Sequence, residues 1–184
     1  MRQLKMNVFS TIVTLLLLGA LAFQDFRERK ISWFLLPLLF FSLVFSAVNA
    51  LPVKELAFYF SVNFSFILLQ VAVLTIYFSI RKKKITHIAN HYIGMGDLLF
   101  FVVICAAFSP VNFIIFYCAS LVVSLLSILL FYLIARRQIK EIPLAGIFSV
   151  VLMLLLIYPA FFGNLREAWV NNFYNDQLVV SIFL

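Results

Sequence analysis

The chain has 184 residues, of which 65% are apolar and only 11% are charged, and its formal net charge is +7. Soluble domains have roughly 45–50% apolar and about 25% charged residues. These values exclude a soluble globular fold, because a chain of this size could not bury so many apolar side chains. The basic residues lie in short breaks between apolar runs, so membrane lipid rather than nucleic acid is the predicted partner.

Six apolar runs predict an all-α integral membrane protein, a six-helix transmembrane bundle in a single domain spanning residues 1–184. The predicted spans are 8–23, 33–51, 56–80, 97–108, 111–135 and 142–162. A full crossing needs about 20 apolar residues, and the first and fourth runs are shorter. A run of about 12 residues is only about 18 Å long as a helix, so the fourth span extends backward or begins inside the membrane boundary.

The first apolar run is predicted to be a retained span rather than a cleavable signal peptide. It is followed by Gln24-Asp25-Phe26-Arg27, which offers no small-residue cleavage site. At the other end, residues 163–184 close on a short apolar run, Leu178–Leu184, that is too short to cross a membrane. This tail is predicted to lie in the outer interface.

The distribution of basic residues predicts the orientation. One set of breaks carries ten Lys or Arg residues and the other set carries four. The ten are Arg27, Arg29, Lys30, Arg81, Lys82, Lys83, Lys84, Arg136, Arg137 and Lys140. Because positive residues concentrate on the cytoplasmic side, this set is predicted to be cytoplasmic and both termini to lie outside.

Two carboxylates stand out among the seven acidic residues of the chain. Asp25 closes the first predicted span and Asp97 opens the fourth. The first span runs inward and the fourth runs outward, so both side chains are predicted at the cytoplasmic face, at similar depth. Carboxylates inside a membrane boundary are costly and usually functional. Topology alone leaves a second interpretation open, in which each carboxylate is only an interfacial cap, with Asp97 favoured by the positive end of its helix.

The residues before Asp97 favour a functional interpretation. Two of the five glycines in the chain, Gly94 and Gly96, stand in the sequence Gly94-Met95-Gly96-Asp97. Glycine allows positive φ and lets another chain approach without a Cβ in the way. Such access is what a protease acting on an extended peptide needs.

Other candidate sites have weaker patterns. Cys105 and Cys118 both fall in predicted spans, and neither a disulfide framework nor a zinc site is predicted from them. His87 and His91 could share a helical face, but Ile88 stands where the zinc protease motif needs glutamate. No metal and no cofactor is therefore expected.

The sequence Gly94-Met95-Gly96-Asp97 resembles the GxGD signature of type IV prepilin peptidases and related intramembrane aspartyl proteases. The segment from Asp25 to Ile31 is similar to the Asp-x-Arg-x-Arg-x-Ile segment of the prepilin peptidase branch. The resemblance covers nearly the whole chain up to Phe162.

The resemblance implies an aspartic endopeptidase of the bacterial cytoplasmic membrane that removes the basic leader of a prepilin or pseudopilin. It implies Asp25 and Asp97 as catalytic residues at the cytoplasmic face. It also implies substrate-binding or site-shaping roles for Gly94, Gly96, Arg27, Arg29 and Lys30. Two carboxylates that share a site would hold one proton between them, one acting as base and the other polarising the scissile carbonyl.

The chain departs from this family at several positions. The family commonly has Lys two residues after the second aspartate, where this chain has Leu99, and Pro-Asn where it has Ser32-Trp33. It lacks a cysteine-rich insert, so methyltransferase activity is not expected. The alternative interpretation is a non-catalytic membrane assembly subunit or a small transporter. The centres of the spans carry no Asp, Glu, Lys, Arg or His, which argues against an ion-coupled transporter.

Overall fold

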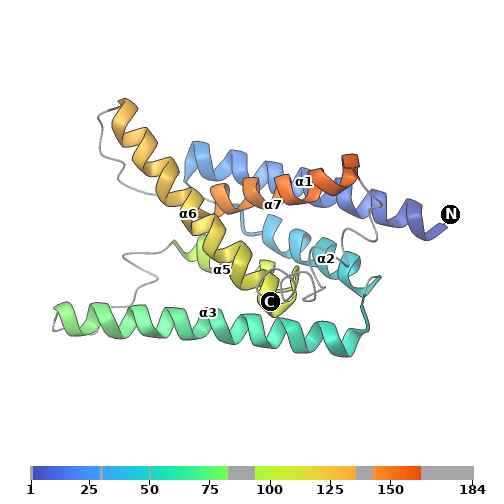
Figure 1. The fold of residues 1–184 in the computed structure, drawn as a ribbon, viewed down its shortest axis with the longest axis horizontal. Coiled ribbons are helices and arrows are strands. Elements are labelled where there is room, and N and C mark those ends of the chain that lie inside the picture. The colour runs from blue at the N-terminus through green and yellow to red at the C-terminus, as the bar shows by residue number, and fades with distance from the viewer. Residues whose placement is uncertain (1, 30, 50, 83–93, 136–142, 163–184) are drawn as a thin grey trace, which may run out of the picture.

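The computed structural model describes residues 2–29, 31–49, 51–82, 94–135 and 143–162 (Figure 1). Within these ranges the secondary structure is helical, without strands. The helices are α1 (Arg2–Glu28), α2 (Leu35–Val48), α3 (Val53–Lys82), α5 (Met95–Ile104), α6 (Pro110–Ala135) and α7 (Leu144–Phe162). The predicted all-α class is therefore confirmed for the described part of the chain.

Three helices are long and apolar enough to cross a membrane. They contain the segments Phe9–Glu28, Val53–Arg81 and Pro110–Phe131. The apolar helices Leu35–Val48, Met95–Ile104 and Leu144–Ile157 are shorter. Each of the six predicted runs overlaps one helix. The ends differ most in α1, which continues to Glu28, and in α5, which ends at Ile104. The predicted tail, 163–184, lies outside the described residues.

Helices α1 and α7 lie side by side and run in opposite directions, and α2 packs against α1 (Figure 1). Asp25 of α1 contacts Gly146 near the start of α7, whereas Gly19 faces Met153 further along α7. Helices α5, α6 and α7 meet in an aromatic layer. The Phe101 ring stands 5.1 Å from that of Phe148 and 5.5 Å from that of Tyr117, between ring centroids. Ring contacts of this kind fix the level of α5 against its neighbours.

Hydroxyl groups link α1 to α2 inside the bundle. Thr14 Oγ1 lies 2.7 Å from Ser42 Oγ, and the hydroxyls of Ser10 and Ser46 are hydrogen-bonded to each other. Thr14 also donates to the carbonyl of Ser10 in its own helix, at 2.9 Å. Lipid tails are as apolar as leucine, so hydrogen bonds and close packing carry much of the specificity of helix pairing in a membrane.

Asn63 joins α3 to the turn that connects α5 and α6. Its Nδ2 donates to the carbonyl of Cys105 at 3.0 Å and to that of Phe108 at 2.8 Å. Residues 105–109 form this turn and are all buried. Irregular backbone at membrane depth is tolerated where it is buried in protein and its polar groups have partners. The side chain of Asn63, which is 1% exposed, supplies two of those partners.

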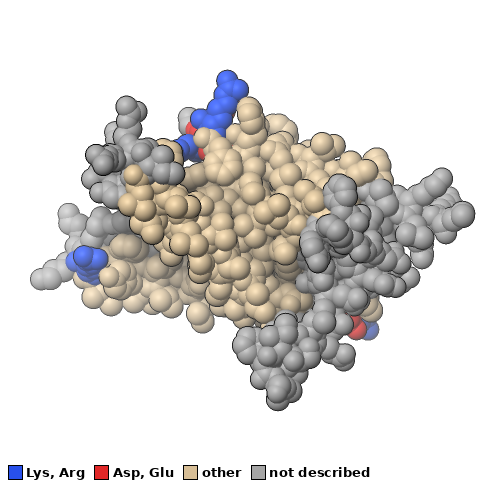
Figure 2. Space-filling view, turned by 45° about the horizontal axis from the view of Figure 1, so that its top comes forward, with Lys and Arg blue, Asp and Glu red and all other residues tan. Residues whose placement is uncertain are grey.

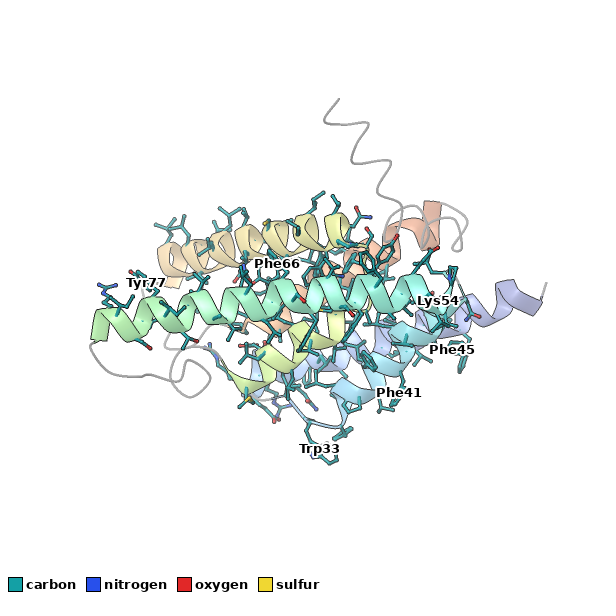
Figure 3. All side chains as sticks on the ribbon, turned by 90° about the horizontal axis from the view of Figure 1, so that it is seen from below. Trp33, Phe41, Phe45, Lys54, Phe66 and Tyr77 are labelled. Carbon is teal, nitrogen blue, oxygen red and sulfur yellow. The ribbon has the colours of Figure 1, made fainter. Side chains whose placement is uncertain are left out.

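Charged residues lie near the edges of the surface in Figure 2, and the centre of this face is formed by other residue types. Many large apolar side chains point outward. Along the lower edge of the bundle in Figure 3, Trp33, Phe41 and Phe45 project away from the other helices, and Lys54 lies near the start of α3. This pattern reverses that of a soluble protein and matches a surface surrounded by lipid.

Candidate active site

Asp25 lies in the last turn of α1, and its side chain is buried. It is 5% exposed and is the only acidic residue among the buried polar residues of the described part of the chain. Its Oδ2 accepts a hydrogen bond of 2.6 Å from the backbone N–H of Gly146. A buried carboxylate without a partner is very costly, so this bond is what makes the position tolerable.

Asp97 lies in the first turn of α5 and is half-buried. Its Oδ1 accepts a hydrogen bond of 3.1 Å from the backbone N–H of Ala145. The helix begins at Met95, and the N–H of Leu98 already donates to the carbonyl of Gly94 at 3.2 Å. Asp97 therefore comes from the N-terminal end of its helix, whereas Asp25 comes from the C-terminal end of another.

The N-terminus of α7 brings the two carboxylates together. Helix α7 starts at Leu144, directly after Pro143, so Ala145 and Gly146 are in its first turn. N–H groups of a first turn have no partner within their own helix, and the helix dipole makes this end positive. Two successive N–H groups donate here to two different aspartates, 48 and 121 residues away in the chain. The arrangement is an anion-binding helix N-terminus occupied by two side chains.

Glycine at position 146 makes the contact with Asp25 possible. A Cβ at this position would lie 3.0 Å from Oδ2 of Asp25 and 3.3 Å from its Cβ. Both distances are shorter than ordinary van der Waals contacts, and the Asp25 side chain that the new Cβ would meet is itself buried. The close approach of α1 to α7 therefore depends on the missing side chain.

Gly94 and Gly96, which precede Asp97, matter because they lack a Cβ and so leave room for neighbouring side chains. None of the described glycines has a positive φ, and Gly94 is extended with φ −61°. Neither Gly94 nor Gly96 therefore uses the positive φ that glycine allows. A Cβ on Gly94 would lie 3.3 Å from Oδ2 of Asp97, and a Cβ on Gly96 would lie 3.2 Å from Cδ1 of Ile31.

Two of the basic residues after Asp25, Arg27 and Arg29, lie at the surface. Arg27 is exposed, and its guanidinium stands 5.7 Å from the centroid of the Phe23 ring. Arg29 has a φ of 53°, and its N–H donates to the carbonyl of Asp25 at 3.1 Å. This left-handed residue turns the chain away at the end of α1, and its charge interacts with the Asp25 carboxylate. Lys30 lies outside the described residues.

Leu99, which occupies the position of the family's lysine, is 47% exposed. Two residues along a helix correspond to about 200°, so Leu99 points to the side of α5 opposite Asp97. It is therefore not a member of the carboxylate site. Among the described residues, no group of three His, Cys, Asp or Glu side chains could hold a metal ion.

Ala145 and Gly146 were missed by the sequence interpretation, because both act through their backbone N–H groups. The available signal was Pro143, which marks a helix start, followed three residues later by one of the few glycines. Comparison with known proteins adds no family to this picture, since no family model, curated protein or solved structure matches the chain.

Proposed function

We propose that this chain is an intramembrane aspartyl endopeptidase whose catalytic residues are Asp25 and Asp97. A single observation carries the proposal: the two carboxylates accept hydrogen bonds from the successive N–H groups of Ala145 and Gly146. One helix end thus holds two acidic groups within electrostatic range of each other. A structural cap would need only one carboxylate at a helix N-terminus, and Asp25 comes from a different helix.

The reaction that such a pair supports is hydrolysis without a covalent intermediate. The ionised carboxylate takes a proton from water while the water oxygen bonds to the scissile carbonyl carbon. The protonated carboxyl group donates a hydrogen bond to the carbonyl oxygen. The peptide C–N bond then breaks and the amine leaves with a proton from the pair, giving one new carboxyl terminus and one new amino terminus. The N–H groups of α7 fix one oxygen of each carboxylate, Oδ1 of Asp97 and Oδ2 of Asp25, and so preorganise the pair.

The particular substrates we propose are type IV prepilins or pseudopilins, whose basic leaders precede an apolar helix. Support comes from the sequence resemblance around Asp25 and Asp97 and from the location of both at inner helix ends in the predicted topology. In this proposal the six helices span the bacterial cytoplasmic membrane, both termini lie outside, and the site faces the cytoplasm. A leader that remains in the cytoplasm would then meet the site from the side on which it is made.

The test is cleavage of a co-expressed prepilin in a host that has no endogenous peptidase of this type. Asp25→Asn and Asp97→Asn keep an acceptor oxygen for the α7 N–H groups but cannot ionise. Each alone should abolish cleavage while the protein is still inserted, and the double variant should be no worse than either, because the two groups act as a unit. Glu28→Gln, three residues after Asp25, is the matched control and should keep most activity. Cleavage by both aspartate variants at the wild-type rate would favour the alternative of a non-catalytic assembly subunit.

A further inference from the structure

The connection between α1 and α2 folds back onto the helix end that carries Asp25. Gln24, the residue before Asp25, accepts a hydrogen bond of 3.1 Å at its Oε1 from the backbone N–H of Ser32. Both residues are half-buried. The start of the connection is thus fastened to the last turns of α1 rather than extending freely from it.

The same connection contacts the helix end that carries Asp97. Ile31, next to Ser32, places its Cδ1 3.2 Å and its Cγ1 3.5 Å from the point where a Cβ of Gly96 would stand. Gly96 directly precedes Asp97. The chain that uses the space left by this glycine is therefore part of the protein itself. Ile31 also packs against the hydrophobic core, so it is held from both sides.

We infer that Gln24, Ile31 and Ser32 form a clip that sets the spacing of Asp25 and Asp97. The clip fastens the residue next to one carboxylate to the residue next to the other. Helix α7 binds an oxygen of each aspartate, but these two bonds alone do not fix the position of α1 relative to α5. The Gln24–Ser32 hydrogen bond and the Ile31–Gly96 contact add a second connection between the two helices and restrict their relative movement. Gln24 and Ile31 are then positioning residues for the two aspartates. Their role in catalysis rests on the proposed function.

The clip can be tested by adding a Cβ at Gly96 and removing side-chain atoms from Ile31. Gly96→Ala should lower kcat at least about 10-fold with little change in KM, because a displacement near 1 Å at reacting groups can cost about 100-fold. Ile31→Ala removes Cγ1 and Cδ1, so the double variant Gly96→Ala/Ile31→Ala should recover much of the lost kcat. If Gly96 instead served substrate approach, Gly96→Ala would raise KM and Ile31→Ala would not rescue it. That result would overturn the inference.

Gln24→Met tests the other half of the clip, since methionine is of similar length and has no amide oxygen for the Ser32 N–H. It should lower kcat and leave KM nearly unchanged. Gln70→Met is the matched control, because it makes the same substitution at a half-buried position of α3 away from the clip. Equal kcat for Gln24→Met and Gln70→Met would contradict the inference.

A readout without catalysis separates this inference from the proposed function. In a chain with Cys105 and Cys118 changed to alanine, cysteines at positions 25 and 97 should react rapidly with a short bifunctional crosslinker. Adding Gln24→Met should slow the crosslinking several-fold, and adding Gln70→Met should not. If the chain with both aspartates cleaves no prepilin but the cysteine variants give this crosslinking result, the proposed function is refuted and the clip is supported. If the chain with both aspartates cleaves prepilin but the cysteine variants crosslink at equal rates with Gln24→Met and with Gln70→Met, the clip alone is refuted.

Discussion

The side-chain amide of Asn63 lies 2.8 Å from the carbonyl oxygen of Phe108, 45 residues further along the chain. Together with the bond to Cys105, this contact gives both amide hydrogens a partner. The carbonyls of Cys105 and Phe108, both in the α5–α6 turn, thereby accept from one side chain. One buried side chain therefore holds an irregular turn that would otherwise be costly in an apolar environment.

Asn63→Leu, which keeps the approximate size but removes both donors, should destabilise the protein by about 1–3 kcal/mol, the cost of leaving buried acceptors unpaired. Thermal unfolding in detergent measures the change. Ser61→Ala is the control on the same helix, because the Ser61 hydroxyl is exposed and donates to the carbonyl of Ala57 within α3. Its effect should stay below about 0.5 kcal/mol. Equal losses for the two variants would contradict the role of Asn63.

Gly146→Ala should reduce prepilin cleavage at least about 10-fold. The new Cβ would displace the Asp25 carboxylate by a few tenths of an ångström, and small displacements of reacting groups are costly. Gly19→Ala is the matched control in α1, since its Cβ would meet Met153 Cε at an ordinary 3.8 Å. Cleavage by Gly19→Ala should remain close to wild type. Initial rates for the two variants, at equal amounts of inserted protein, are the measurement. Full activity of Gly146→Ala would show that the close approach of α7 to Asp25 is dispensable.

The ends of α3 test the proposed orientation. Single cysteines at Lys54 and Lys82, in a chain without Cys105 and Cys118, should react with a membrane-impermeant thiol reagent from opposite sides. Intact cells should label position 54, and position 82 should require opened membranes. The expectation follows from the positive-inside distribution of Lys and Arg. Labelling of position 82 but not of position 54 in intact cells would place the carboxylate site on the outer face, and labelling of both would show that α3 does not cross the membrane.

The hydroxyl contacts between α1 and α2 should couple energetically. A double-mutant cycle with Thr14→Val and Ser42→Ala should give an interaction of about 0.6 kcal/mol, the average for hydrogen bonds between membrane helices, and at most about 1.7 kcal/mol. Unfolding in mixed micelles measures the four corners of the cycle. Thr75→Val is the control, because the Thr75 hydroxyl donates to the carbonyl of Val71 within its own helix. It should show no coupling to Ser42→Ala.

Composition and the apolar runs predicted the helices. A segment at membrane depth has no water to bind its backbone N–H and C=O groups, and a helix pairs these groups internally. The helix ends were less predictable. Four of the five residues in Gln24–Glu28 are polar, but all five are compatible with a helix, so α1 continues past the end of its apolar run. Asp25 therefore lies within the helix rather than after it. Hydropathy predicts where contact with lipid ends. The backbone hydrogen bonds of α1 continue beyond that point, to Glu28.

The site was predictable in its side chains and not in its backbone. Asp25 and Asp97 could be found because carboxylates are rare in this chain and because both fall at helix ends. The N–H groups of Ala145 and Gly146 could not be found in the same way, since every residue except proline has one. Gly96 was predicted to allow close approach of another chain. The approaching group was expected to be a substrate, whereas the structure has Ile31 there. Distances between segments far apart in sequence decide such questions.

The contact between Gly146 and Asp25 spans 121 residues, and this has a consequence for the order of events during synthesis. The ribosome delivers Asp25 early and Asp97 later, but the donors that hold them are made only with α7. Until that last described helix has emerged and inserted, the two carboxylates lack the groups that bind them. A nascent chain arrested before Pro143 would therefore carry both aspartates without an assembled site. The paired-carboxylate site thus assembles only once α7 is in place, so under the proposed function an unfinished chain would have no peptidase activity.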